Sequence, residues 1–353
     1  MNRIEHIIRS IRLGDRAAAE AAKKRWDSIA KPLGRLGAME EMIIRIAALQ
    51  ATADIRLDRR ALLVFCADHG VTAQGVSQCG SEVTARVAVA LAEGRSSVSP
   101  MADRAGCLVV PVDIGIKDFP GHAGVRNLRV RNGTDDLSLG PAMSRDECLL
   151  AIWRGADLVR KFAENGTELF AVGEMGIGNT TAAAALASVL LDLSAEAAVG
   201  RGAGLSSAGL ERKRDAVRRA LEVNQPDPDD IPGLLAKVGG LEIAAMCGAI
   251  LGAAFCRKPV IIDGVISAAA ALCAVRLCPD AADALLPSHV SAEPAGRELL
   301  NALGLRAPLD AGMYLGEGAG AVMLMPLLDL ALSLYRSGQD FARLGIEAYQ
   351  PQK

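Results

Sequence analysis

The chain has 353 residues, enough for about two domains at roughly 150 residues each. Hydrophobic residues make up 51% and charged residues 23%, which excludes disordered, collagen-like and disulfide-scaffold proteins. Lys and Arg number 39 against 41 Asp and Glu, so the formal net charge is −2 and the basic surface expected of a nucleic-acid binder is lacking. Aromatic residues make up only 3% and glycines number 36, so we expect an aliphatic core and function in glycine-rich loops.

The cysteines and the apolar stretches indicate the compartment. The eight cysteines include no Cys-x-x-Cys pair and the chain has four histidines, so we expect no structural zinc site. Most of the cysteines lie in apolar runs, as small buried side chains in a reducing compartment do. The charged N-terminal segment is unlike a signal peptide. The two most apolar stretches, residues 241–278 and 318–335, are interrupted by charged residues and by Pro326, so we expect no membrane insertion and a cytoplasmic protein.

Helices come first along the chain, and strands then alternate with helices. Residues 3–50 have apolar side chains every three or four positions, which predicts helices separated by the segment 31–34. Beyond them, short apolar runs lead through loops into helical patterns, which is typical of an α/β protein with a parallel, doubly wound sheet. These runs span residues 61–66, 107–112, 168–172 and 259–262.

One helix has clear start and stop signals. Ser144 and Glu147 form a capping-box pattern, and Asn165 with Gly166 predicts the end of the same helix. The segment that begins at Gln225 is a connector between helices within the fold. Ligands of open parallel sheets bind outside the carboxyl ends of the strands, so the loops after the predicted strands are where chemistry is expected.

Two glycine-rich loops suit a phosphate. Residues 173–181 follow a predicted strand and precede a helix, so backbone amides and the helix N-terminus can face an anion. The alternative is a tight turn in which Asn179 or Thr180 caps the helix. A second loop, residues 199–205, precedes a helix that carries Lys213, a compact charge that suits a phosphate. On its own, Lys213 fits a solvated helix face beside Arg212 and Arg214 better than a phosphate site. Together the two loops favour a phosphorylated substrate.

A third glycine cluster, residues 315–320, contains the lone carboxylate Glu317. Near apolar surface such a glutamate is desolvated, its pKa rises and it becomes useful as a general base. The alternative is that Glu317 lies in the first turn of the following helix and interacts with the helix dipole.

Several polar residues follow the predicted strands. His69 is expected to be a hydrogen-bonded loop residue, because no nucleophile motif accompanies it. Asp113 and Asp263 end strands as ligand contacts or as loop anchors. Residues 288–293 offer hydroxyl groups to a phosphate or cap the next helix.

The order of these segments resembles the family of nicotinate-nucleotide:dimethylbenzimidazole phosphoribosyltransferases. The resemblance rests on residues 31–37 (KPLGRLG), 67–71 (ADHGV), 173–181 (GEMGIGNTT), 199–204 (VGRGAG), 237–240 (KVGG), 288–293 (SHVSAE) and 315–320 (LGEGAG). It implies a large Rossmann-like domain over residues 51–285, a small helical domain built from residues 1–50 and 286–353, and a homodimer. The implied reaction transfers phosphoribose from nicotinate mononucleotide to an aromatic lower-ligand base, giving an α-ribotide and nicotinate. It implies neither a cofactor nor a metal.

The resemblance also assigns site residues. It implies Glu317 as general base with Glu174 close by. The expected contacts to the nucleotide are Gly176, Asn179, Thr180, Gly202, Lys213, Asp263 and Ser291. The expected base pocket is formed by Cys79, Val87, Met175 and Leu315. Cys79 and Val87 stand where relatives that use benzimidazole tend to carry Ser and Gln. The resemblance therefore does not fix the identity of the accepted base.

Two other functions compete with this one. A nucleotide-sensing protein on the same fold keeps the glycine loops but does not need Glu317. A different phosphoribosyltransferase, using phosphoribosyl pyrophosphate, needs Mg²⁺, and the acidic pair Asp135-Asp136 lies in an expected turn. A dehydrogenase is not supported, since the loop 173–181 lacks the third glycine of a dinucleotide fingerprint.

Overall fold

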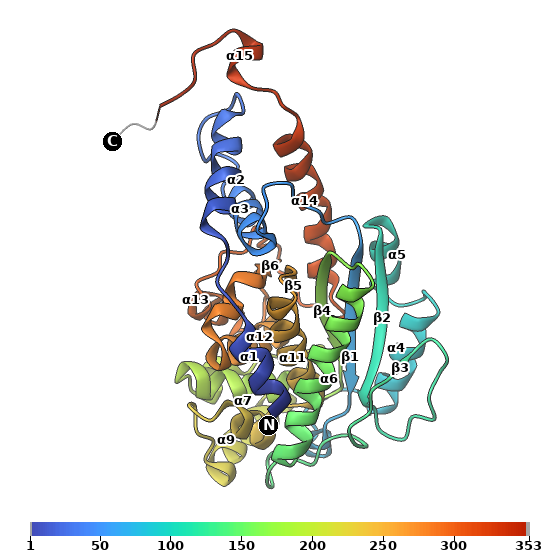
Figure 1. Cartoon of the computed structure of the whole chain (residues 1–353). Helices are drawn as coiled ribbons and strands as arrows, with labels where there is room; N and C mark the ends of the chain where they lie inside the picture. Colours follow the sequence, from blue (N-terminus) through green and yellow to red (C-terminus); the bar gives the residue numbers. More distant parts are fainter. Residues whose placement is uncertain (1, 351–353) are drawn as a thin grey trace.

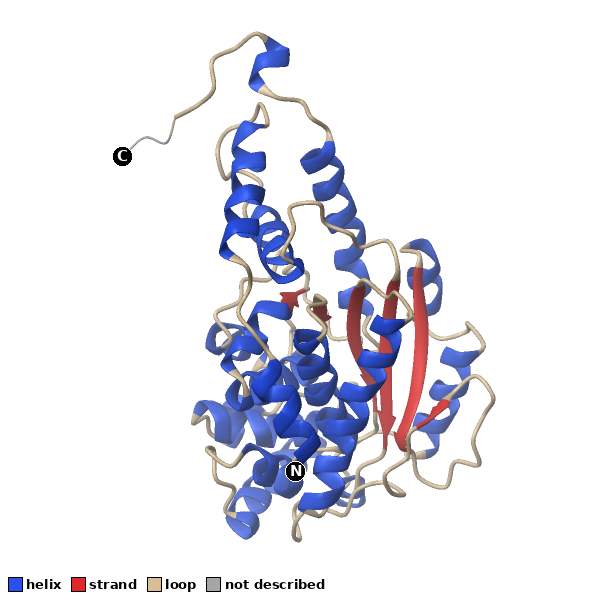
Figure 2. Cartoon of the chain, in the orientation of Figure 1, coloured by secondary structure: helices blue, strands red, loops and turns tan. Residues whose placement is uncertain are grey.

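A six-stranded sheet with all strands parallel lies at the centre of the computed structural model, which describes residues 2–350 (Figure 2). The strand order is β3-β2-β1-β4-β5-β6, so the direction in which strands are added reverses between β1 and β4. The predicted α/β class with a parallel, doubly wound sheet is confirmed. The strands are β1 (Arg60–Ala67), β2 (Cys107–Gly115), β3 (Arg126–Asn127), β4 (Leu169–Met175), β5 (Val260–Ile262) and β6 (Leu285–Pro287).

The four predicted strands are present, and two short strands extend the sheet beyond them. β3 has two residues, both exposed, and β6 has three, so neither contains an apolar run long enough to be recognised. By contrast, β1 is buried from Ala61 to Ala67. Helices cover both faces of the sheet, so side chains that point either way from this strand are apolar.

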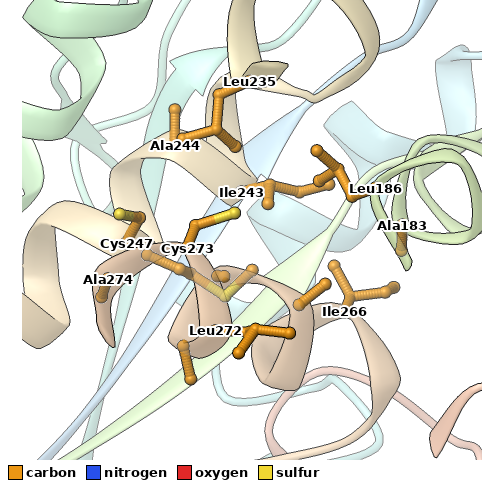
Figure 3. Close-up of a cluster of buried hydrophobic side chains, with 14 of the residues drawn as sticks. Ala183, Leu186, Leu235, Ile243, Ala244, Cys247, Ile266, Leu272, Cys273 and Ala274 are labelled. Carbon is orange, nitrogen blue, oxygen red and sulfur yellow. The ribbon is translucent and has the colours of Figure 1, made fainter. Parts of the chain in front are cut away.

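One face of the sheet packs against the larger set of helices (Figure 1). Leu63 and Phe65 of β1 belong to the core on this face. Figure 3 shows part of that core, where Leu186, Ile243 and Cys273 lie together although they come from three helices. All eight cysteines are free and six are buried, in agreement with the predicted role as small apolar side chains. The longer helices that supply most of this core are α1 (Asn2–Ser10), α6 (Arg145–Glu164), α7 (Asn179–Leu191), α9 (Ser207–Asn224), α10 (Ile231–Val238), α11 (Leu241–Phe255) and α12 (Val265–Leu277).

The opposite face packs against fewer helices. Leu62 and Val64 of β1 point to this side and belong to a second hydrophobic core. The helices of this core are α2 (Arg16–Ser28), α3 (Ala38–Gln50), α4 (Glu82–Ala92), α5 (Ser99–Arg104) and α14 (Ala319–Arg336). Short elements connect the rest of the chain: η1 (Gly70–Gln74), α8 (Ala195–Ala198), η2 (Pro279–Ala284), α13 (Gly296–Ala302) and α15 (Phe341–Leu344).

The two ends of the chain meet beyond the sheet. The rings of Trp26 in α2 and Tyr335 in α14 have centroids 5.1 Å apart, and Ile29 pairs with Asp340 in an antiparallel bridge. α3 also contacts α14, and Figure 1 shows α2, α3 and α14 together at one end of the molecule. N-terminal helices therefore pack against a C-terminal helix, as the resemblance implied.

Helix α6 begins and ends at the predicted signals. Ser144 Oγ accepts the amide of Glu147, and the Glu147 carboxylate accepts the amide of Ser144 at 2.8 Å, which completes the capping box. The helix ends at Glu164, and Asn165 is its C-cap. It crosses α11 in direct backbone contact, since a Cβ added at Gly248 would lie 1.8 Å from the carbonyl oxygen of Ile152. Only glycine fits at that crossing.

Helix α14 continues through Pro326, one of the residues that interrupt the apolar stretch 318–335. With 18 residues it is long and apolar enough to cross a membrane. However, 56% of the helix is buried inside the protein, where it packs on the sheet and on α3. Such burial is typical of a core helix of a soluble protein.

Candidate active site

A cavity of about 320 Å³ opens at the carboxyl ends of the strands. It lies where the strand order reverses, so the loops after β1 and β4 diverge and leave room between them. The predicted site residues that line it are Cys79, Val87, Glu174, Met175, Gly176, Asn179, Thr180, Gly202, Asp263, Ser291, Leu315 and Glu317. Lys213 lines a smaller adjoining pocket of about 80 Å³, which shares Gly176, Asn179, Thr180 and Gly202 with the cavity. The structure therefore brings every predicted site residue together.

The loop between β4 and α7 forms one wall of the cavity. A Cβ added at Gly176 would lie 2.4 Å from the carbonyl oxygen of Ala67, so only glycine allows this loop to pass the end of β1. Gly178, with φ 100°, is the N-cap of α7 and supplies no side-chain acceptor. The alternative in which Asn179 or Thr180 caps the helix is therefore wrong. The Asn179 amide group instead donates to the Glu174 carboxylate.

Lys213 projects from α9 toward this loop and is fully buried. Its Nζ donates to Thr180 Oγ1 at 2.7 Å and to the carbonyl oxygen of Gly200 at 3.2 Å. Burial lowers the pKa of Lys213 to about 8, and Glu293 partly opposes the shift. The solvated helix face considered for Lys213 is thus wrong. A buried cation with two neutral oxygen partners is well placed to receive an anion.

The second glycine loop lies beside Lys213. Gly202 has φ 52°, a conformation that favours glycine, and a Cβ there would lie 3.3 Å from Lys213 Nζ. Its amide donates to Glu293 Oε1 at 3.0 Å. Sequence reasoning did not single out Glu293, although the residue lies at the end of the segment 288–293 and lines the cavity.

Glu174 and Glu317 lie on the same side of the cavity. Gly173 in β4 has no side chain, and a Cβ there would lie 2.6 Å from the amide nitrogen of Gly318. The loop ahead of α14 therefore rests directly on β4. A Cβ added at Gly316 would lie 2.9 Å from Glu174 Oε1, so this loop also touches the Glu174 carboxylate.

The two carboxyl groups have different surroundings. Burial raises the pKa of Glu174 to about 8, with further increases from Asp263, Glu242 and Glu317 and an opposing effect of the Asn179 hydrogen bond. Glu317 is only half-buried, and its Oε2 accepts the amide of Val98 at 3.2 Å. It has φ 56° and precedes Gly318, the N-cap of α14, so it does not lie in the first helical turn. The alternative of a first-turn helix-dipole contact is wrong, and the desolvated glutamate is Glu174.

Asp263 follows β5 and anchors the start of α14. Its Oδ1 accepts the amide of Ala321 at 3.1 Å, and burial raises its pKa to about 6 against the effect of the neighbouring backbone amides. A Cβ added at Gly320 would lie 2.1 Å from His289 Nδ1, so His289 fills the space beside this anchor. Asp263 is therefore a loop anchor that also lines the cavity.

Asp113 and His69 do not line the cavity. Asp113 accepts the amide of Ile116 at 2.9 Å and Arg129 Nε at 3.0 Å, so it is a loop anchor. His69 is buried with its Nε2 2.7 Å from Glu242 Oε1, which confirms the predicted hydrogen-bonded loop residue. The partner Glu242 lies in α11 and carried no recognisable sequence signal.

The mouth of the cavity is mostly apolar. Val83 and Val87 lie on successive turns of α4, opposite Met175 and Leu315. Cys79 lies just before this helix, with its Sγ 3.7 Å from Ser77 Oγ. The side chains of Tyr314 and Leu315 are 61% and 59% exposed, so this side of the cavity is open to solvent.

Comparisons with known proteins agree on one family. The model of a phosphoribosyltransferase family matches residues 11–346. The nicotinate-nucleotide–dimethylbenzimidazole phosphoribosyltransferase of Acetivibrio thermocellus is 41% identical over 333 residues, which cover 94% of this chain and 95% of that protein. The enzyme of the same name from Desulforudis audaxviator is 42% identical over 335 residues and 94% of each chain. The crystal structure of CobT from Thermus thermophilus superimposes with a TM-score of 0.89 at 40% identity, covering 94% of this chain and 100% of that one.

The raised pKa of Glu174 predicts a specific pH dependence of stability. Between the ordinary value of 4.5 and about 8, the folded protein holds a proton on Glu174 that the unfolded chain releases. The stability that this proton contributes is complete below pH 4.5 and is lost as the pH rises through about 8. Glu174→Gln removes this dependence, so the melting temperature of the variant relative to the parent should be higher at about pH 9 than at about pH 5.

The exposed Glu222→Gln supplies the control, because it makes the same chemical change on the surface of α9. Thermal unfolding of the three proteins at both pH values is the measurement. Equal Glu174→Gln differences at the two pH values would show that Glu174 is ionised in the folded state throughout.

Proposed function

The chain belongs to the family of nicotinate-nucleotide–dimethylbenzimidazole phosphoribosyltransferases, and we infer from this membership that the cavity at the carboxyl ends of the strands is its active site. The enzyme transfers the phosphoribosyl group of nicotinate mononucleotide to dimethylbenzimidazole. The products are α-ribazole phosphate, used in cobamide assembly, and nicotinate. The residues that carry out this transfer are proposed below from the geometry of the cavity.

We propose that the nucleotide phosphate binds between the two glycine loops and Lys213. The observation that carries this proposal is the buried ammonium group of Lys213, whose two hydrogen-bond partners are neutral oxygens. Gly176 and Gly202 lie within the same small pocket, where their lack of side chains lets backbone amides approach an anion. Asn179 and Thr180, at the start of α7, complete this end of the cavity.

The ribose is then placed in the middle of the cavity. Ser291 and Asp263 lie on the wall formed by the loops after β5 and β6, next to the phosphate pocket. Hydroxyl and carboxylate oxygens are suitable partners for ribose hydroxyl groups. Glu174 lies close by and, with a pKa of about 8, carries a proton at neutral pH. A neutral Glu174 avoids charge repulsion with the incoming phosphate and can donate a hydrogen bond.

Glu317 is the proposed general base. A nitrogen of the imidazole ring attacks C1′ of the ribose, the bond between C1′ and the pyridinium nitrogen breaks, and its electron pair neutralises that nitrogen. Nicotinate therefore leaves without needing a proton. The attacking ring becomes neutral only when its other nitrogen loses a proton, and Glu317 accepts it. The Val98 amide holds the Glu317 carboxylate at the cavity rim for this purpose.

The accepting base is proposed to bind between α4 and the opposite rim. Val87 and Cys79 lie on the α4 side, and Met175 and Leu315 lie across from them. This pocket offers apolar contact and few directional hydrogen bonds. The base is then proposed to lie between Glu317 and the proposed ribose position.

Domain organisation, oligomeric state and location complete the proposal. Residues 1–50 and 286–353 are proposed to form a small helical domain beside the large domain of residues 51–285, supported by the contacts of α2 and α3 with α14. A cytoplasmic homodimer is also proposed. Exposed apolar side chains on α14, Met323 at 42% and Leu330 at 68%, offer a surface that a second copy could cover.

Replacing the proposed base is the primary test. Glu317→Gln keeps the shape and the amide contact but cannot accept the proton, so kcat should fall by about 10² to 10⁴ while the protein folds normally. The exposed Glu298→Gln serves as control and should keep full turnover. Full activity of the Glu317→Gln protein would remove Glu317 from the mechanism. A parent protein that is inactive with every base tried would favour a nucleotide sensor.

The proposed phosphate site predicts that removing the charge of Lys213 chiefly weakens nucleotide binding. Lys213→Met keeps the apolar stem and removes the charge, so the affinity for nicotinate mononucleotide should fall by about 1.5 to 3 kcal/mol, or roughly 10- to 150-fold. Calorimetric titration of the free enzyme measures this directly. Lys161→Met, on the exposed side of α6, should bind as the parent does. Unchanged affinity in the Lys213→Met protein would place the phosphate elsewhere.

The apolar lining of the proposed base pocket predicts that the enzyme accepts several different aromatic bases. Apolar pockets discriminate a methylene by only about 1 to 3 kcal/mol, whereas polar pockets discriminate more sharply. The enzyme should accept benzimidazole and its methylated forms with little selectivity and use adenine poorly, because the adenine amino group finds no partner. Competition assays with mixed bases measure this. Either a strong preference for adenine, or no added selectivity in the Cys79→Ser, Val87→Gln double variant, would show that these positions do not govern base choice.

A further inference from the structure

Thr84 is a buried residue that connects two walls of the cavity without lining it. It lies in the first turn of α4 and is 0% exposed. Its Oγ1 is 2.6 Å from Asp68 Oδ1 and accepts the amide of Ile177 at 3.2 Å. The amide can only donate, so the single hydroxyl proton of Thr84 goes to Asp68. One side chain thus joins α4 to the loop between β4 and α7.

Asp68 extends this connection to the neighbouring strands. It follows β1, and its Oδ2 accepts the amide of Lys117, just after β2, at 2.8 Å. Its own amide donates to the carbonyl oxygen of Gly115 at 3.0 Å, and its carbonyl oxygen accepts the amide of Thr134 at 2.9 Å. Asp68 is only 1% exposed, so solvent cannot replace these partners. Asp68 and Thr84 together fix the ends of β1 and β2 to α4. Through the Ile177 amide, Thr84 also fixes them to the loop after β4.

The two elements joined by Thr84 serve different substrates in the proposed function. α4 carries Val83 and Val87 on the side of the accepting base. Ile177 lies between Gly176 and Gly178 in the loop of the nucleotide phosphate, and it lines both the cavity and the adjoining pocket. The hydrogen bond from the Ile177 amide to Thr84 therefore sets the distance between the base side and the nucleotide side.

We propose that Thr84 and Asp68 are positioning residues that hold the accepting base and the nucleotide at reaction distance. This inference rests on the proposed function, since it uses the assignment of the two sides of the cavity. Transfer between two bound substrates depends steeply on their alignment, and a displacement of about 1 Å can cost about 100-fold in rate. Neither residue touches a substrate, so their loss should alter the rate of transfer more than the binding of either substrate alone.

The test compares three variants of the full-length enzyme. Thr84→Val has nearly the same shape and loses both hydrogen bonds, so kcat should fall by about 10- to 100-fold while the Kd for nicotinate mononucleotide, measured by calorimetry, changes by less than about threefold. Thr84→Ser keeps the hydroxyl group and should restore kcat to within about threefold of the parent. Thr167→Val, a nearly buried threonine at the amino end of β4, is the matched control and should leave kcat unchanged.

The outcomes separate the positioning role from a purely structural one. A Thr84→Val protein with parental kcat, or a Thr84→Ser protein as slow as Thr84→Val, would overturn the proposal. If Thr84→Val does not fold, Thr84→Cys retains a weak donor and acceptor and should give an intermediate kcat with parental nucleotide affinity. Parental kcat in that variant would also overturn it.

Failure of the proposed function gives a different pattern. If Lys213→Met and Glu317→Gln behave as expected and Thr84→Val does not, only the positioning role is wrong. If all three variants keep the parental constants, the assignment of the cavity is wrong as well.

Discussion

The backbone contact between β4 and the loop ahead of α14 is the constraint on which the candidate site depends. Gly173 leaves no room for a side chain between its Cα and the amide nitrogen of Gly318, so the loop lies flat against the strand. This contact places Glu317, which is far along the chain, next to Glu174 at the end of β4. Any side chain at Gly173 would push the loop outward and separate the two carboxyl groups.

Burial and hydrogen bonds limit the negative charge that the carboxyl groups bring to the cavity. Glu174, Asp263, Glu293 and Glu317 all line it, and a phosphate must enter the same space. Burial raises the pKa of Glu174 to about 8, so this group is protonated at neutral pH and the cavity is less negative than four ionised carboxylates would make it. The pKa of Asp263 is raised to about 6, so Asp263 is mostly ionised at neutral pH, and its Oδ1 accepts the amide of Ala321. Glu293 is tied to the Gly202 amide. The remaining carboxylate, Glu317, is the one held at the open rim.

Much of the fold and the location of the site followed from the sequence. Strands buried on both faces leave continuous apolar runs, so β1, β2, β4 and β5 were predicted, whereas β3 and β6 are too short to leave a run. The glycine loops and Glu317 were recognised because each glycine cluster directly precedes a predicted helix, and because Glu317 is the lone carboxylate of its cluster. Lys213 was not recognised as buried, because adjacent residues of a helix face different surroundings and its neighbour Arg212 is exposed.

Other features depend on side-chain pairs that no sequence motif reveals. The capping role expected of Asn179 or Thr180 was wrong because Glu174 binds the Asn179 side chain and Lys213 donates to Thr180. Glu242 and Thr84 lie within helices and look like ordinary helix residues; their partners His69 and Asp68 lie 173 and 16 residues from them. Periodicity and motif spacing report local structure, so such partners become visible only after the sheet has assembled.

The meeting of the two chain ends has a consequence for synthesis on the ribosome. Trp26 leaves the ribosome early, but its ring partner Tyr335 lies near the end of α14, so α2 and α3 must wait for nearly the whole chain before their apolar faces are covered. Domains generally fold as units during synthesis, and exposed apolar surface in the interval favours aggregation. Glu317 arrives in the same late segment. A chain released before α14 is made would therefore contain all six strands, but its N-terminal helices would be uncovered and the proposed general base would lack the helix that follows it.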